Sequence, residues 1–349
     1  MAADAGPASA PKVAINARAA ARAQIGGVER FAREMTRRLP QLRPERYRVI
    51  QPPATLAHRA GHLWEQAVLP LQAGRCELVY SPANLAPVLS RRNVLVIHDA
   101  ASLRHPEAYS RAYVAYQRRM LPLLARHARL LITVSEFSKR ELTEVLGVAP
   151  ERITVIPEGV DEGFGEALDP APAAARYELT QPYVLVLGTV SERKNLGLLG
   201  PAARALRERG IELVIAGSDR SYLRAAPVSL RRLGYIAEEH LRGLYAGARA
   251  LAMPSLYEGF GLPCLEAMAC GTPVVAAASG ALPETVGDAG LLVDAHDADA
   301  FASALVAAAC DEDVGKRLVE AGRRRAAVFS WSRTAALTDA AIGELLVSR

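Results

Sequence analysis

The chain of 349 residues is longer than one ordinary hydrophobic core requires and suits two domains of roughly 150 to 180 residues each. Half of its residues are hydrophobic and 5% are aromatic, a composition that excludes an intrinsically disordered protein. The chain has no long apolar run, no signal-peptide pattern and no paired-cysteine spacing, so we expect a cytoplasmic protein without a membrane span, structural zinc or disulfides.

The net charge of +5 is distributed unevenly. Residues 1–160 hold 23 Lys and Arg against 13 Asp and Glu, a net of +10, and the remainder of the chain carries −5. A basic first half favours an anionic partner, such as a phospholipid surface or a diphosphate-linked acceptor. Nucleic acid is the alternative partner, but no helix-turn-helix, RNP or zinc-finger pattern occurs, so we expect none.

The first half of the chain alternates short apolar stretches with helical patterns. Five stretches are predicted strands: 13–16, 47–51, 77–80, 94–98 and 130–134. Three longer stretches between or after them are predicted helices: 27–39, 110–126 and 136–146. Nearly all-apolar strands that alternate with helices predict a parallel sheet covered on both faces.

The same pattern restarts after a segment rich in Gly, Pro, Ala and acidic residues. We predict further strands at 183–187, 211–216, 251–253 and 274–277, and helices at 195–209 and 238–248. The expected organisation is an N-terminal domain at 1–160, a linker at 161–182 and a C-terminal domain at 183–349. The last helix is a candidate for crossing back to the first domain.

Parallel sheets of this kind bind ligands at the carboxyl ends of their strands, so two facing domains predict a site in the cleft between them. The strongest motif, PSLYEGFGLPCLEAMACG at 254–271, follows a predicted strand. Gly259 and Gly261 allow the backbone to approach a ligand, and Pro263 suits the first turn of a helix. The backbone amides of such a helix start form an anion site suited to a diphosphate.

Two acids of this motif are spaced as E-x7-E. Glu266 lies about one turn into the predicted helix, where its carboxylate can accept hydrogen bonds from a ribose diol. Glu258 lies on the preceding loop, in reach of the hydroxyls of a bound sugar. The alternative is that Glu266 is a solvated helix residue and Glu258 an ordinary loop carboxylate.

The stretch resembles the signature of the retaining glycosyltransferases of family 4. This resemblance implies the GT-B fold, an α/β architecture of two Rossmann-like domains that face a central cleft. It also implies that the domain at 183–349 binds a nucleotide-sugar donor, that the domain at 1–160 binds the acceptor, and that no metal is required. The donor contacts implied in this loop are Glu258, Gly259, Phe260, Gly261, Leu262 and Glu266.

A second match is GTVSERKN at 188–195, directly after a predicted strand. In the family a basic pair of this loop contacts the donor phosphates, and Arg193 and Lys194 match it, with Gly188 beside them. A departing diphosphate needs fixed cations or a metal to meet its growing charge. A solvated helix cap is the alternative reading of the two side chains.

Further matches follow in the family's order. Gly26 and Gly27 precede the first helix and are expected to close over the diphosphate from the first domain. His98 matches a residue that contacts the donor sugar, although a buried histidine at a strand end is the alternative. Gly234 and Tyr235 resemble the segment that contacts the nucleobase. The resemblance therefore assigns catalytic roles to His98, Arg193, Lys194 and Glu258.

Other phosphate and metal sites are not expected. Asp297-Ala298-Asp299 and Asp311-Glu312-Asp313 satisfy a DxD pattern, but neither follows a buried strand, so capping roles suffice. No G-x-G-x-x-G follows the first strand and no G-x-x-x-x-G-K-[ST] occurs, which argues against a nicotinamide dehydrogenase or an ATPase.

The expected activity is retaining, metal-independent hexosyl transfer to a saccharide or a polyprenol-diphosphate-linked saccharide. Segments 63–66 and 80–84 resemble bacterial mannosyltransferases of surface-polysaccharide assembly, which favours GDP-mannose, with a UDP-sugar as the alternative donor. A nucleotide-sugar epimerase or hydrolase on the same fold and a non-catalytic partner subunit remain alternatives.

Residues 109–131 raise the question of a membrane surface. The segment combines five arginines with apolar side chains, so an amphipathic helix with a basic side is expected, kinked or broken at Pro122. Such a face could associate weakly with the inner face of an anionic plasma membrane. The alternative is an arginine-rich solvated helix that packs its apolar side on the sheet.

Overall fold

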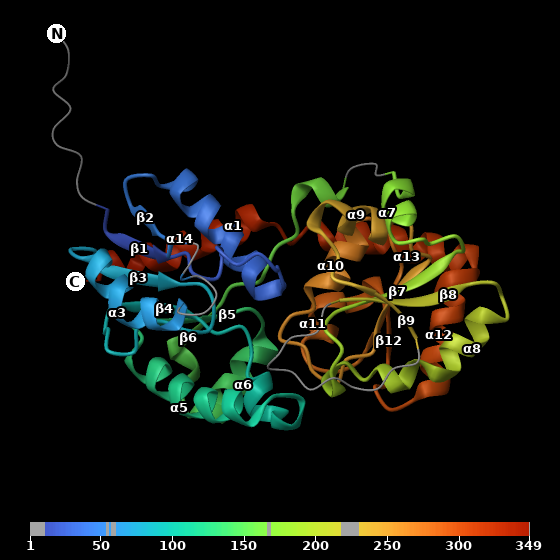
Figure 1. Cartoon of the computed structure of the whole chain (residues 1–349), viewed down its shortest axis with the longest axis horizontal. Helices are drawn as coiled ribbons and strands as arrows, with labels where there is room; N and C mark the ends of the chain where they lie inside the picture. Colours follow the sequence, from blue (N-terminus) through green and yellow to red (C-terminus); the bar gives the residue numbers. More distant parts are fainter. Residues whose placement is uncertain (1–10, 54–55, 57–60, 166–168, 218–229, 349) are drawn as a thin grey trace, which may run out of the picture.

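Two α/β halves, each built on a six-stranded parallel sheet, make up the molecule (Figure 1). The computed structural model describes residues 11–53, 56, 61–165, 169–217 and 230–348. The first sheet has the order β2-β1-β3-β4-β5-β6: β1 (Val13–Asn16), β2 (Tyr47–Ile50), β3 (Leu78–Ser81), β4 (Asn93–Val96), β5 (Leu130–Thr133) and β6 (Ile153–Val155). The second has the order β12-β11-β10-β7-β8-β9: β7 (Tyr183–Leu187), β8 (Glu212–Ala216), β9 (Arg231–Gly234), β10 (Ala250–Met253), β11 (Val274–Ala277) and β12 (Leu291–Val293).

Helices cover both sheets (Figure 1). In the first half these are α1 (Gly27–Leu42), α3 (Gly61–Ala73), α4 (Ala101–Arg104), α5 (Arg111–His127) and α6 (Glu136–Leu146). The second half contains α7 (Ala171–Arg176), α8 (Gly200–Arg207), α9 (Glu238–Ala246), α10 (Leu262–Ala269), α11 (Leu282–Val286), α12 (Ala298–Cys310), α13 (Glu312–Ala326) and α14 (Trp331–Val347). The predicted α/β fold with two Rossmann-like halves is confirmed. No helix in the described ranges combines the length and apolarity needed to cross a bilayer.

The central strands could be predicted from the sequence because their burial makes them apolar. Strands β1, β3, β4, β10 and β11 are buried at every position, as expected for parallel strands covered by helices on both faces. The edge strand β2 is buried only at its two end residues. The edge strands β9 and β12 are only partly buried, and neither was predicted as a strand.

Two predicted helices differ in the structure. The helix expected at 195–209 begins only at Gly200, after short 3-10 turns at Glu192–Lys194 and Leu196–Leu199. Asn195 adopts a left-handed conformation with a φ of 52°, which interrupts the helical path. Helix α5 continues through Pro122, which is exposed, so the prediction of a break there is wrong. On the exposed side, the carbonyl that loses its partner can bond to water.

The chain crosses between the two halves twice, at neighbouring positions. Val160 and Ser330 form an isolated parallel bridge, and α14 then packs against α1 of the first half (Figure 1). Asp339 of α14 accepts hydrogen bonds from Arg46 and from the Tyr47 hydroxyl, both at 2.7 Å. The C-terminal helix therefore belongs to the packing of the N-terminal sheet.

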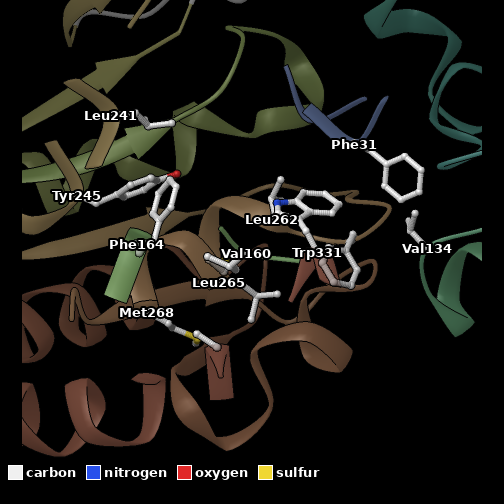
Figure 2. Packing of buried hydrophobic residues seen from close by; sticks show 14 of the residues in the cluster. Phe31, Val134, Val160, Phe164, Leu241, Tyr245, Leu262, Leu265, Met268 and Trp331 are labelled. Carbon is white, nitrogen blue, oxygen red and sulfur yellow. The ribbon is translucent and has the colours of Figure 1, made fainter. Parts of the chain in front are cut away.

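One buried apolar cluster runs through both halves and the crossing (Figure 2). Phe31 of α1 and Val134 after β5 pack in the first half, and Trp331 lies at the start of α14. Leu262 and Leu265 of α10 continue the cluster in the second half. Shared burial of this kind joins the two sheets across the base of the cleft.

Candidate functional site

A cavity of about 780 Å³ lies between the two halves, at the carboxyl ends of the strands. Fourteen residues were predicted for the site, and among them only Gly234 does not line the cavity. The lining positions are Gly26, Gly27, His98, Gly188, Arg193, Lys194, Tyr235, Glu258, Gly259, Phe260, Gly261, Leu262 and Glu266. Gly234 takes a φ of 75°, which turns the chain so that Tyr235 reaches the cavity.

Residues 259–262 form the turn from β10 into α10. Gly261 has a φ of 100°, a conformation that favours glycine, and Pro263 occupies the first turn of the helix. A Cβ at position 259 would lie 2.7 Å from the Asp99 side chain and 2.8 Å from the His98 carbonyl oxygen. Glycine at position 259 therefore makes room for His98 and Asp99 of the first half. The sequence analysis had expected this glycine to make room for a ligand instead.

The predicted catalytic cations and acid form one largely buried cluster. The Lys194 Nζ donates to Glu258 Oε1 at 2.6 Å, and an Arg193 Nη1 lies 3.3 Å from Glu258 Oε2. Burial raises the pKa of the Glu258 carboxyl, but the charges of Lys194 and Arg193 outweigh it and lower the pKa to about 2. Arg193 also donates to the Tyr257 carbonyl oxygen. Two basic side chains face one carboxylate, so the cluster carries an excess of positive charge.

The absence of a side chain at Gly188 leaves room for the Lys194 side chain. A Cβ at position 188 would lie 2.8 Å from the Lys194 Cε and 2.9 Å from its Nζ, and the φ there is 143°. A larger residue would displace the lysine. The glycine after β7 is therefore required by the neighbouring cation.

Glu266 is buried with both carboxylate oxygens engaged. Arg30 of α1 donates to Oε1 at 2.9 Å, and the Tyr245 hydroxyl donates to Oε2 at 2.8 Å. The structure thus connects the predicted ribose-binding acid to a side chain of the other half. The sequence analysis gave Arg30 no role.

His98 is fixed by two acceptors. Its Nδ1 lies 3.0 Å from Glu158 Oε1, and its Nε2 lies 2.9 Å from the Pro82 carbonyl oxygen. Burial lowers the pKa of His98, but hydrogen bonding and charge from Glu158 more than compensate and raise it above its usual value. A carboxylate and a carbonyl oxygen both accept, so this geometry favours an N–H on each ring nitrogen.

Glu158 is a site residue to which the sequence analysis gave no role. It lies shortly after β6, and this placement after a strand was the available signal. Asp99, beside His98, accepts a hydrogen bond from the Ala101 amide and lines the cavity.

The first half lines the cavity with a polar lobe that was also missed. Arg18 is 4% exposed, and its Nε lies 3.1 Å from the Oε1 of Glu65, which is 1% exposed. The Asn16 amide donates to the same oxygen at 2.6 Å. Gln117 of α5 is buried at the cavity wall, and its Oε1 has no hydrogen-bond partner among the described residues.

The two halves touch directly beside the cavity. The Ser135 hydroxyl, which caps α6, donates to the Gly259 carbonyl oxygen at 2.6 Å. The Glu284 carboxylate of α11 accepts from the amides of Glu136 and Phe137 at 2.8 and 3.1 Å. An acid of one half therefore also caps a helix of the other.

The acidic DxD pairs lie away from the cavity. Asp297 caps α12 by accepting from the Ala300 amide, and Asp311 caps α13 by accepting from the amides of Asp313 and Val314. Within the described part of the chain, no group of three or more His, Cys, Asp or Glu side chains is arranged to hold a metal ion.

Comparison with known proteins identifies the family. A family model described as Glycosyltransferase Family 4 matches residues 25–164, and one described as Glycosyl transferases group 1 matches residues 181–311. The chain is 33% identical to O-antigen chain mannosyltransferase B of Escherichia coli over 276 residues, which are 73% of this chain and 71% of that protein.

Solved structures agree on the fold. Sucrose-phosphate synthase of Thermosynechococcus elongatus superposes with a TM-score of 0.75 at 22% identity, covering 97% of this chain and 100% of that one. Anabaena HepE in complex with UDP and glucose has a TM-score of 0.71 at 20% identity, covering 95% of this chain and 99% of that one. The chain belongs to the group 1, family 4 glycosyltransferases and has their GT-B fold.

Proposed function

We propose that this glycosyltransferase moves a hexose, with mannose favoured, from a nucleotide-sugar to a saccharide with retention of configuration and without a metal. The observation that carries the proposal is the Arg193–Lys194–Glu258 cluster at the cavity wall. GDP-mannose is the favoured donor because the Escherichia coli relative is a mannosyltransferase by name. The HepE complex with UDP and glucose supports a UDP-sugar as the alternative.

The proposed chemistry begins with the departing diphosphate. Arg193, Lys194 and the backbone amides of residues 259–262 supply fixed positive charge and donors where negative charge develops. Glu258 holds both cations in place and presents its carboxylate to the sugar hydroxyls. We assign no carboxylate of the described cavity wall to a covalent intermediate and favour front-face substitution, in which a phosphate oxygen takes the acceptor proton.

His98 has a more limited role in this scheme than a general base. Because both ring nitrogens face protein acceptors, we propose that His98 does not take the proton of the acceptor hydroxyl. We propose that it contacts the transferred sugar and adds a fixed positive charge near the reacting centre. Its companion Glu158 keeps the ring oriented and protonated.

The acceptor is proposed to enter along the polar lobe of the first half. Arg18 and Gln117 offer hydrogen-bonding groups there, and Tyr109 and Tyr113 form a stacked pair with ring centroids 5.6 Å apart. Aromatic faces and paired polar groups suit a sugar ring. The acceptor class is a saccharide, free or linked to polyprenol diphosphate.

Weak association with an anionic membrane is also proposed. Helix α5 buries Val114, Leu121 and Leu124 against the sheet, so its apolar side is largely occupied by the fold. Its outer face exposes Arg118, Arg119 and other arginines beside Leu123, which is 38% exposed. Binding would be mainly electrostatic. Co-sedimentation with anionic but not neutral vesicles, lost at high salt, is expected; equal, negligible binding to both would contradict it.

A thermal-shift panel tests the donor. GDP, UDP, ADP and their sugars, each in excess EDTA, should include one nucleotide series that raises the melting temperature, because ligand that binds only the folded state stabilises it. Product analysis with and without a saccharide acceptor then separates transfer from epimerisation and hydrolysis. A strict requirement for Mg²⁺ or Mn²⁺ would contradict the metal-independent scheme.

A further inference from the structure

Arg30 links the two halves at the acid that is proposed to bind the donor ribose. It projects from α1 of the first half, and its Nη1 lies 2.9 Å from Glu266 Oε1 of α10 in the second. Its Nη2 lies 3.7 Å from Glu238 Oε1 of α9. The Arg30 side chain is 13% exposed and the Glu266 side chain 4%, so the contact is largely shielded from water.

We propose that Arg30 is a positioning residue for the donor: it orients Glu266 and holds it as a carboxylate, so that ribose binding in one half depends on a side chain of the other. The inference rests on the proposed function, in which Glu266 accepts hydrogen bonds from the ribose hydroxyls. Only an ionised carboxylate can accept on both oxygens while Arg30 and Tyr245 donate to it from the protein.

The surroundings of Glu266 show why it needs this cation. Tyr245 and Glu238 face it from α9, Glu158 from the loop after β6, and Arg30 from α1. Burial raises the pKa of the Glu266 carboxyl above its ordinary value, and Arg30 is the main group that opposes this rise. Without Arg30, burial and the neighbouring carboxylates favour the protonated acid, which has one acceptor oxygen fewer for the ribose.

The geometry allows an opposite role that has to be excluded by experiment. Arg30 occupies one oxygen of Glu266, so it could compete with the ribose and act as a latch that the donor must release. The two roles predict opposite effects on donor affinity. Removing a positioning residue weakens nucleotide binding, whereas removing a competitor strengthens it.

Arg33 provides a matched control on the same helix. It lies one turn along α1, and its Nη1 is 3.6 Å from Glu238 Oε2, so it shares a partner with Arg30 but forms no ion pair with Glu266 in the described structure. Substituting Arg33 changes the charge of α1 equally. A difference between Arg30→Met and Arg33→Met therefore reports on the contact with Glu266.

The test is calorimetric titration of the full-length protein with GDP and UDP between pH 6 and pH 9. For whichever nucleotide the wild type binds, Arg30→Met should weaken binding about tenfold or more at pH 7, the effect of losing a charged hydrogen-bonding partner. The loss should shrink as the pH rises, because Glu266 then ionises without help. Arg30→Lys should restore part of the affinity, and Arg33→Met should match the wild type.

A double-substitution cycle covers the case in which Arg30→Met fails to fold around an unpaired buried carboxylate. On a Glu266→Gln background, Arg30→Met should have no further effect on nucleotide affinity, because Arg30 acts through Glu266. Unchanged or tighter binding by Arg30→Met, or an additive loss in the cycle, would overturn the inference. Failure of the wild type to bind any nucleotide would instead overturn the proposed function on which the inference depends.

Discussion

At the residue scale, substitution of Lys194 tests the proposed role of a fixed cation in the chemistry. Its Nζ donates to Glu258 at the cavity wall, where we propose that it meets a donor phosphate. Lys194→Ala should lower kcat by about 10²–10³, the typical cost of removing one group that stabilises developing negative charge. Steady-state transfer assays measure this. Lys316→Ala, which removes an exposed lysine of α13, should leave the rate unchanged, and a wild-type rate in folded Lys194→Ala would remove Lys194 from the site.

Glu258 makes a second prediction, on stability against pH. Its pKa is lowered from the ordinary value of 4.5 to about 2 in the folded protein. The ionised acid therefore contributes stability above pH 4.5 that is lost as the pH falls toward 2. Glu258→Gln should have a lower urea midpoint than the wild type at pH 7, and this difference should narrow between pH 4.5 and 2.

The exposed Glu312 provides the control for that titration. It pairs only with Lys316 in the same helix, where both side chains are well exposed. Glu312→Gln should follow the wild-type urea midpoint across the whole pH range. A constant difference between Glu258→Gln and the wild type down to pH 2 would show that the carboxylate does not stabilise the fold through its charge.

At the element scale, Gly159 governs how closely the two chain crossings pass. A Cβ at this position would lie 2.2 Å from the backbone of Ser330 and Trp331, where backbone cannot yield as a flexible side chain can. Gly159→Ala should lower the free energy of unfolding by about 1–3 kcal/mol, as overpacking does. Gly165→Ala is the control, because no atom lies within 4 Å of its Cβ position. Equal urea midpoints for the two variants would contradict the tight crossing.

The elements also show which parts of the fold a sequence reveals. The buried central strands are apolar at nearly every position, so their pattern predicted them. Helix α3 was missed because the face that it buries includes Glu65, which pairs with Arg18 of another element. The two edge strands β9 and β12 were missed because partial burial removes the apolar signal.

At the scale of the whole molecule, the site residues that follow strands could be predicted, whereas their pairing could not. The glycines and acids of residues 258–266 carry a local pattern. The contact of Arg30 with Glu266 joins residues 236 positions apart, and the contact of His98 with Glu158 joins residues 60 apart. Such pairs exist only once both sheets and both crossings have formed, so no local pattern encodes them.

The central claim is that the cleft between the two halves transfers a hexose with retention and without a metal. It is tested most directly by following the anomeric proton by NMR while the wild-type protein consumes GDP-α-mannose, or the nucleotide-sugar chosen by the thermal-shift panel, in excess EDTA. Water or an added lipid-linked saccharide serves as the acceptor. The first-formed product should have the α configuration of the donor, and Lys194→Ala should form it far more slowly. A β-configured first product, or no turnover until a divalent metal is restored, would contradict the account.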